Sequence, residues 1–147
     1  MYKHLLIPTD GSKLSDKAVT HALGLAEALG ARVTVLHVSP DYPQPIYMEG
    51  IALNPMSRRD YAKSTTEESK KVFARVAKKA AAAGVASTMV HMIAETPWEA
   101  IMATAKKRKC DVIVMASHGR RGLAAMLLGS ETTKVLTHSK VPVLVVR

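Results

Sequence analysis

Short apolar segments alternate with helical patterns along nearly the whole chain, and this alternation limits the fold more than any other feature. The segments expected to form strands are 5–7, 33–38, 87–93, 111–116 and 143–146. Between them, apolar residues recur every three or four positions, as on one face of a helix. Strands that are apolar on both faces and separated by helices form parallel sheets covered on both sides. The sequence therefore predicts a single doubly wound α/β domain over residues 1–147, with helices on both faces.

Several helix boundaries can be predicted from single residues. Gly30 is placed to end the first helix, and a second, longer helix should end near Gly84. For the third helix, Thr96 is expected at the N-cap, with Glu99 completing a capping box. The fourth helix is expected over 130–138.

Composition indicates a soluble protein without a membrane segment. The hydrophobic fraction is 48% and the charged fraction 22%, which is ordinary for a globular domain. No apolar run approaches the ~18 residues of a membrane helix, and the apolar stretch in MYKHLLIPTD is too short for a signal peptide. We therefore expect a cytoplasmic protein. The single cysteine, Cys110, excludes an internal disulfide, and the six histidines lack metal-ligand spacing, so no metal site is expected.

The chain is strongly basic, with 21 Lys and Arg against 12 Asp and Glu, a net charge of +9 and a pI near 9.9. Such a charge favours anionic partners. The lysines are spread along the predicted helices as on solvated faces, and one Phe and one Trp are too few for a base-stacking platform. General nucleic-acid binding is therefore not favoured.

In doubly wound sheets, ligands bind beyond the carboxyl ends of the strands, which directs attention to the turns after Ile7, Val38 and Met115. Residues 39–56 follow the second strand, contain four of the seven prolines and show no clear period. We expect this segment to be a long mobile excursion with a lid role. It is also the only candidate for a second substrate pocket, which an adenylating enzyme would need.

The stretch PTDGS leaves the first strand, where Asp10 could point its carboxylate into the crevice. In the alternative interpretation, Asp10 and Gly11 supply only turn geometry and Ser12 or Ser15 caps the next helix. Spacing alone does not separate the two.

A glycine cluster after the fourth strand is the stronger signal. In MASHGRRGLAAMLLGS the glycines are Gly119, Gly122 and Gly129. They would place backbone N–H groups beside the N-terminus of the last helix, which favours a phosphate. Ser130 adds a hydroxyl, and Arg120 and Arg121 add charge. In the alternative, Gly129 ends a tight turn and Ser130 is only an N-cap. The two familiar phosphate motifs, G-x-x-x-x-G-K-[ST] and G-x-G-x-x-G after the first strand, are absent.

Four stretches together resemble the universal stress protein family over nearly the whole chain: KHLLIPTDGS, VTVLHV, DVIVMASHGRRGLAAMLLGSETTKVL and VPVLVVR. The nucleotide-binding branch of that family is marked by G-x2-G-x9-G-[ST]. Gly119, nine intervening residues, Gly129 and Ser130 match its later part, while Ala116 replaces the first glycine.

The resemblance implies a nucleotide site. Pro8, Thr9 and Asp10 would lie by the adenosine, and the Val38 backbone would meet the adenine edge. Residues 116–122 would wrap the ribose and phosphates. The implied nucleotide-binding residues in this part of the chain are Met115, Ala116, Ser117, His118, Gly119, Arg120, Arg121 and Gly122. Ser130, Glu131 and Thr132 would lie at the phosphate end. The implied ligand is ATP, or ADP or AMP, with Mg²⁺ held through the phosphates.

The resemblance also implies the sheet order 3-2-1-4-5 and a homodimer made by antiparallel pairing of the last strand, Val143 to Val146. An apolar edge strand of this kind invites such pairing. The leading hypothesis is an ATP-binding, dimeric regulatory module of the stress response, with at most slow ATP hydrolysis and no assigned catalytic residue. The alternatives are a dimeric interaction protein of the same fold that binds no nucleotide, or an enzyme that activates ATP for adenylation.

Overall fold

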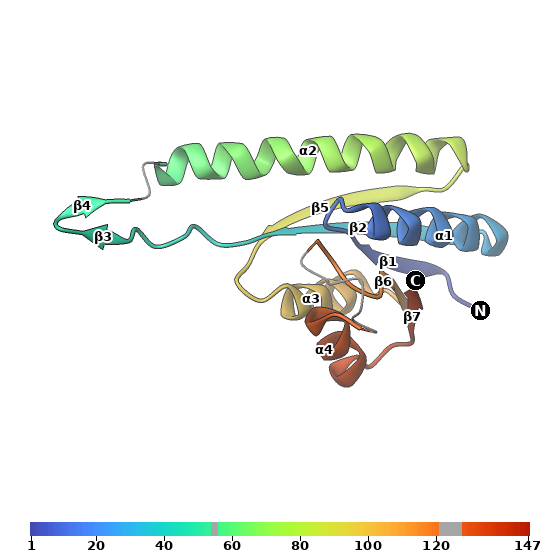
Figure 1. The fold of residues 1–147 in the computed structure, drawn as a ribbon. Helices are drawn as coiled ribbons and strands as arrows, with labels where there is room; N and C mark the ends of the chain where they lie inside the picture. The colour runs from blue at the N-terminus through green and yellow to red at the C-terminus, as the bar shows by residue number, and fades with distance from the viewer. Residues whose placement is uncertain (54–55, 121–127) are drawn as a thin grey trace.

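A parallel sheet of five strands forms the centre of the computed structural model, which describes residues 1–53, 56–120 and 128–147 (Figure 1). The order across the sheet is β5 (Ser87–Ile93), β2 (Arg32–Ser39), β1 (His4–Pro8), β6 (Val112–Ala116) and β7 (Val143–Val146). Counting only these strands along the chain, the order is 3-2-1-4-5, so the predicted topology is confirmed. The strand labels run to β7 because β3 and β4, which form a separate hairpin, are numbered as well.

Helices cover both faces of the sheet, as the alternating pattern predicts. Figure 1 shows α1 (Lys13–Leu29) and α2 (Arg58–Ala82) on one side and α3 (Pro97–Arg108) and α4 (Ser130–His138) on the other. None of the helices in the described parts of the chain is both long and apolar enough to cross a membrane.

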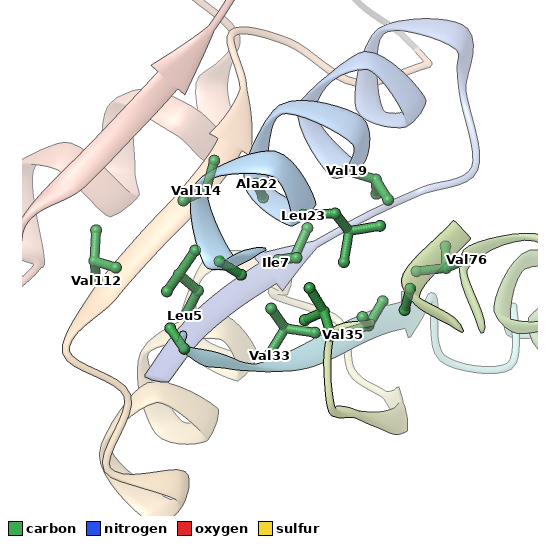
Figure 2. Close-up of a cluster of buried hydrophobic side chains, with 14 residues drawn as sticks. Leu5, Ile7, Val19, Ala22, Leu23, Val33, Val35, Val76, Val112 and Val114 are labelled. Carbon is green, nitrogen blue, oxygen red and sulfur yellow. The ribbon is translucent and has the colours of Figure 1, made fainter. Parts of the chain in front are cut away.

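Alternation along the central strands divides the core into two halves. Leu5 and Ile7 of β1 point toward α1, where they meet Val19 and Ala22 (Figure 2). Leu6, between them, belongs to the cluster on the α3 and α4 side. All three β1 leucine and isoleucine side chains are fully buried. This burial on both faces explains why β1 is apolar without interruption.

The helix ends agree with the sequence in part. Gly30 caps α1 with φ +62°, a left-handed conformation that glycine adopts without strain. Thr96 lies at the N-cap of α3, but its hydroxyl bonds the Glu99 carboxylate at 2.5 Å and makes no capping bond to the backbone. The predicted capping box is therefore wrong. The Trp98 N–H instead donates to Glu131 from α4 at 2.8 Å, which sequence spacing could not reveal.

Residues 39–56 contain a short antiparallel hairpin that the sequence did not predict. Its strands are β3 (Tyr47–Met48) and β4 (Ile51–Ala52), joined by Glu49 and Gly50 with φ +49° and +80°. Two successive positive φ values are typical of a type I′ turn, where Asn-Gly would be the usual signal. Figure 1 shows the hairpin extending away from the sheet, beyond the helices that flank it.

Candidate functional site

The topology brings the carboxyl ends of β1, β2 and β6 together. β1 lies between β2 and β6, and Pro8 and Ala116 are the last residues of their strands. The strands after β1 are added first on its β2 side and then on its β6 side, so the direction of strand order reverses at β1. The crevice at such a reversal is where doubly wound sheets bind ligands. Asp10, Val38 and the loop that follows Ala116 therefore lie at the same edge of the sheet.

Asp10 connects the β1–α1 turn to the loop after β6. Its Oδ1 accepts the Ser12 N–H at 2.9 Å, and its Oδ2 accepts the Arg120 N–H at 2.7 Å. Burial acts to raise the pKa of Asp10, but the hydrogen bonds from Ser12 and Arg120 outweigh it and hold this pKa below its ordinary value. Asp10 is therefore an ionised acceptor at neutral pH.

The β1–α1 turn itself is held by short polar contacts. The buried Thr9 hydroxyl lies 3.0 Å from the Ser15 hydroxyl and accepts the Gly11 N–H at 3.2 Å. Ser12 is the N-cap of α1 and accepts the Ser15 N–H at 3.2 Å. The capping interpretation of this stretch is thus correct for Ser12. It does not exclude a binding role, because Asp10 reaches across to another loop.

Two α2 residues reach this turn, and no sequence motif pointed to them. Glu68 pairs with the Arg120 guanidinium at 2.6 Å. Arg75 donates to the Gly11 carbonyl at 3.2 Å. A Cβ built on Gly11 would lie 3.2 Å from a guanidinium nitrogen of both Arg75 and Arg120. The spacing of seven between Glu68 and Arg75 places them on one helix face, but that spacing is common to any two-turn pair.

The start of α4 is fastened to the end of β6. The buried Thr132 hydroxyl donates to the Ala116 carbonyl at 3.0 Å, and the Gly129 N–H donates to the Ser117 carbonyl at 2.7 Å. Ser117 in turn donates its N–H to Val146 of β7 at 2.8 Å. Ser117 and Thr132 are therefore occupied in holding the helix N-terminus against the sheet edge.

Both site glycines that the structure describes make close approaches within the protein. A Cβ on Gly119 would lie 2.6 Å from the Asp10 Oδ2. A Cβ on Gly129 would lie 3.1 Å from the His118 Cα and Cβ. These contacts explain the glycines without a ligand, so the glycine spacing is not by itself evidence for phosphate binding.

No side chain among the described residues caps the N-terminus of α4. Gly129 is the N-cap and Ser130 the first helical residue, so the interpretation of Ser130 as the N-cap is wrong. Ser130 is exposed, and its hydroxyl has no hydrogen bond to the residues that the structure describes. The unpaired N–H groups and positive dipole end of a helix suit an anion. Glu131, in contrast, is occupied by Trp98 and by Lys134 at 3.2 Å.

The remaining predicted residues are placed differently. Met115 is buried in the core cluster on the α3 and α4 side, so only its backbone is available to a ligand. Val38 is half-buried near the end of β2. His118 is half-buried, with Nδ1 3.3 Å from the Ser117 hydroxyl. Arg121 and Gly122 lie in 121–127, outside the described residues.

A pair of histidines beside Val38, buried His37 and half-buried His91, was also missed by sequence reasoning. His37 Nδ1 lies 2.7 Å from the Ser69 hydroxyl of α2, and His91 Nε2 lies 2.9 Å from the Ser39 hydroxyl. The two rings stack with centroids 5.8 Å apart. Burial lowers the pKa of both histidines. No i, i+4 spacing marks the pair, because strands β2 and β5 bring it together by register.

Two shallow hollows lie away from the crevice. One of about 420 Å³ is lined by Asp16 of α1 and by Arg75, Lys78, Lys79 and Ala82 of α2. The other, of about 430 Å³, lies between α1 and the end of β7. In the first hollow Lys79 pairs with Asp16 at 2.7 Å, whereas groups from four separate parts of the chain converge at the carboxyl edge of the sheet.

Comparison with known proteins agrees with this architecture. The family model described as "Universal stress protein family" matches residues 1–147. Universal stress protein MJ0531 of Methanocaldococcus jannaschii is 35% identical over 150 residues, covering 100% of this chain and 83% of the relative. Universal stress protein YxiE of Bacillus subtilis is 33% identical over 149 residues and covers 100% of both chains. The chain belongs to the universal stress protein family.

Solved structures show the same fold. The structure of MJ0577, from M. jannaschii, has a TM-score of 0.81 at 28% identity and covers 99% of this chain and 96% of that one. A universal stress protein in complex with cAMP has a TM-score of 0.70 at 23% identity, covering 99% and 97%. One from Archaeoglobus fulgidus in complex with dAMP has a TM-score of 0.69 at 17% identity, covering 99% and 98%. At these identities the last two comparisons establish the fold alone.

Proposed function

We propose that this universal stress protein binds an adenine nucleotide, ATP in the first place and ADP or AMP as alternatives, at the carboxyl edge of β1 and β6. Binding, not turnover, is its main event, and the protein acts in the cytoplasm as a regulatory module of the stress response. The observation that carries the proposal is the convergence of the Asp10 carboxylate, the Arg120 guanidinium and the α4 N-terminus, which no described side chain caps, at one sheet edge.

The residues present suit a nucleotide chemically. A carboxylate such as Asp10 accepts hydrogen bonds from ribose hydroxyls. Arg120 and Arg75 supply positive charge for phosphates, and the α4 N-terminus supplies N–H donors with the Ser130 hydroxyl beside them. The carboxylates of Asp10 and Glu68 are both engaged by Arg120. Mg²⁺ would therefore be held through the phosphates and not by these side chains.

Two further facts support the choice of adenine nucleotides. Relatives of the same fold are complexes with cAMP and with dAMP, which share the adenine base. The G-x9-G-[ST] part of the motif is intact in this chain at Gly119, Gly129 and Ser130. Ala116 replaces the first motif glycine. Its backbone carbonyl accepts a hydrogen bond from the Thr132 hydroxyl, and this bond does not depend on whether residue 116 is alanine or glycine.

Calorimetric titration with ATP, with and without Mg²⁺, tests the proposal. Arg120→Gln should weaken binding by about tenfold to a hundredfold, because a hydrogen bond to a charged phosphate contributes ~1.5–3 kcal/mol. Ser130→Ala should weaken it by about fivefold or more, because one hydrogen bond to a phosphate oxygen is lost. Arg59→Gln and Ser87→Ala make the same chemical changes at exposed sites elsewhere and should bind as the parent does. Equal affinity in all five proteins would refute the site.

A dimeric interaction protein that binds no nucleotide is the second candidate. The ion pair between Arg120 and Glu68, together with the Asp10 contact, already spans the crevice, which favours this reading. A parent protein that shows no heat of binding with millimolar ATP would support it. Phosphate release measured on the same sample would distinguish simple binding from slow hydrolysis.

The proposed dimer uses the free edge of β7. Among the described strands, β7 ends the sheet order and pairs with β6 alone, and Leu144 in it is 37% exposed. Antiparallel pairing of two such edges would satisfy the unpaired backbone groups. Val145→Pro removes one ladder donor and should shift sedimentation toward the monomer. A parent protein that sediments as a monomer at micromolar concentration would contradict this interface.

A further inference from the structure

The hairpin of β3 and β4 presents one strongly apolar face. Met48 pairs across the strands with Ile51, and the Leu53 N–H donates to the Ile46 carbonyl at 2.8 Å. Because side chains alternate along a strand and pairs share a face, Ile46, Met48, Ile51 and Leu53 lie on one side, which we call the hairpin face. Their side chains are 67%, 63%, 67% and 54% exposed.

The base of the hairpin is built to hold it outward. The Tyr42 hydroxyl donates to the Met56 carbonyl at 2.6 Å, and the Tyr61 hydroxyl donates to the Pro40 carbonyl at 2.8 Å. The two tyrosine rings meet edge to face at 5.5 Å, and the Arg58 guanidinium lies 4.9 Å from the Tyr42 ring centre. These contacts fix the segment to the start of α2, and the hairpin extends away from the sheet and the helices (Figure 1).

An isolated two-stranded hairpin is marginal in water and needs a third surface to cover its apolar side chains. Four large apolar side chains on one small face exceed what scattered surface residues explain. No described residue of the same chain covers them, since each is more than half exposed. The hairpin face is therefore suited to an occupant from outside its own chain.

Charge identifies the kind of occupant. From residue 33 to residue 57 the chain contains Asp41 and Glu49 and no Lys or Arg, whereas the whole chain carries +9. Two acidic and no basic residues in this stretch favour a basic protein surface over nucleic acid or an anionic lipid surface as the neighbour of the hairpin face. The basic surface always present with the hairpin face is that of a second copy of this chain.

We propose that the hairpin face, Ile46, Met48, Ile51 and Leu53, docks on the basic body of a second copy of this chain. This association is independent of nucleotide binding and adds to, or acts in place of, pairing through β7. Because burying each large apolar side chain stabilises an interface, removing two of them should raise the dimer dissociation constant about tenfold or more.

The test uses purified full-length protein alone. In sedimentation equilibrium, the double variant Met48→Ser, Ile51→Ser should dissociate at about tenfold higher concentration than the parent. Tyr47→Ser removes a side chain of similar exposure from the opposite hairpin face and should associate as the parent does. Circular dichroism checks that the variants remain folded. We expect them to fold because neither core cluster contains a hairpin residue.

A photo-cross-linking amino acid at position 48 gives an independent readout. The expected adduct contains two chains, and peptide mapping should place the attachment in the sheet and helices of the second chain. Adducts confined to one chain, unchanged association of the double variant, or a parent that is monomeric throughout would overturn the proposal. Flotation of the parent, but not of the double variant, with anionic vesicles would assign the face to a membrane and overturn it as well.

Discussion

Asp10→Ala should destabilise the protein through the loop after β6. The change removes the acceptor for two backbone N–H groups, Ser12 at 2.9 Å and Arg120 at 2.7 Å. A hydrogen bond to a charged group contributes ~1.5–3 kcal/mol. Because Asp10 is only half-buried and water can replace it in part, we take the lower end for each bond and expect a loss of about 3 kcal/mol. For a domain of this size this lowers the Tm by roughly 6–12 °C.

The assay is urea unfolding followed by circular dichroism, with thermal melts in parallel. Asp10→Asn keeps one acceptor oxygen and should lose about half as much stability. Glu27→Ala removes an exposed carboxylate of α1 that has no hydrogen bond to the described residues, and it should stay within about 0.5 kcal/mol of the parent. Both aspartate variants remove the charge, so the difference between them measures the one acceptor oxygen that Asn keeps.

The acid dependence gives a second readout of the same contact. The pKa of Asp10 is lowered from its ordinary 3.8 in the folded protein. Its contribution is therefore fully present above pH ~3.8 and is lost as the pH falls through the lower folded pKa. The stability difference between parent and Asp10→Ala should be constant from pH 5 to 8 and shrink below pH ~3.8. If Asp10→Ala melts with the parent at pH 7, the carboxylate does not hold the loop.

Three further predictions concern other positions. Gly129→Ala should cost ~1–3 kcal/mol of unfolding free energy because its Cβ would lie 3.1 Å from His118, whereas Gly24→Ala, with nothing within 4 Å, should add ~0.5–1 kcal/mol. Burial lowers the pKa of His37 and of His91 from 6.5, so the free energy of unfolding in urea should fall as the pH drops below 6.5. If this free energy depends on pH in His37→Gln as steeply as in the parent, the prediction is contradicted. Burial raises the pKa of Cys110 to about 11, so iodoacetamide should label it slowly at pH 8 and quickly in urea; fast labelling of the folded protein would contradict its burial.

Most of the sheet follows from sequence because its signals are local and redundant. The five parallel strands are each predicted to within one residue at either end, and the order 3-2-1-4-5 is implied by the family resemblance. Gly30 and the start of α4 at residue 130 were also predicted correctly. The hairpin was missed because Glu49 adopts a positive φ, and glutamate is not a residue type that predicts this conformation.

The candidate site was only half visible in the sequence. The motif residues after β6 mark the edge of the sheet, yet Glu68 and Arg75 enter from α2 through tertiary packing and belong to no motif. The same holds for Glu131, which matches the family's phosphate end by position but caps α3 in this structure. Contacts between distant segments depend on helix docking, and single-sequence spacing contains no information about docking.

Identification of the nucleotide that remains bound after purification tests the central claim most directly. The protein is purified without added nucleotide, denatured, and the released small molecules are separated and weighed by mass spectrometry, with Arg120→Gln prepared in parallel. We expect an adenine nucleotide to be released by the parent and clearly less of it by Arg120→Gln. A parent that releases no adenine nucleotide and shows no binding heat with millimolar ATP would contradict it.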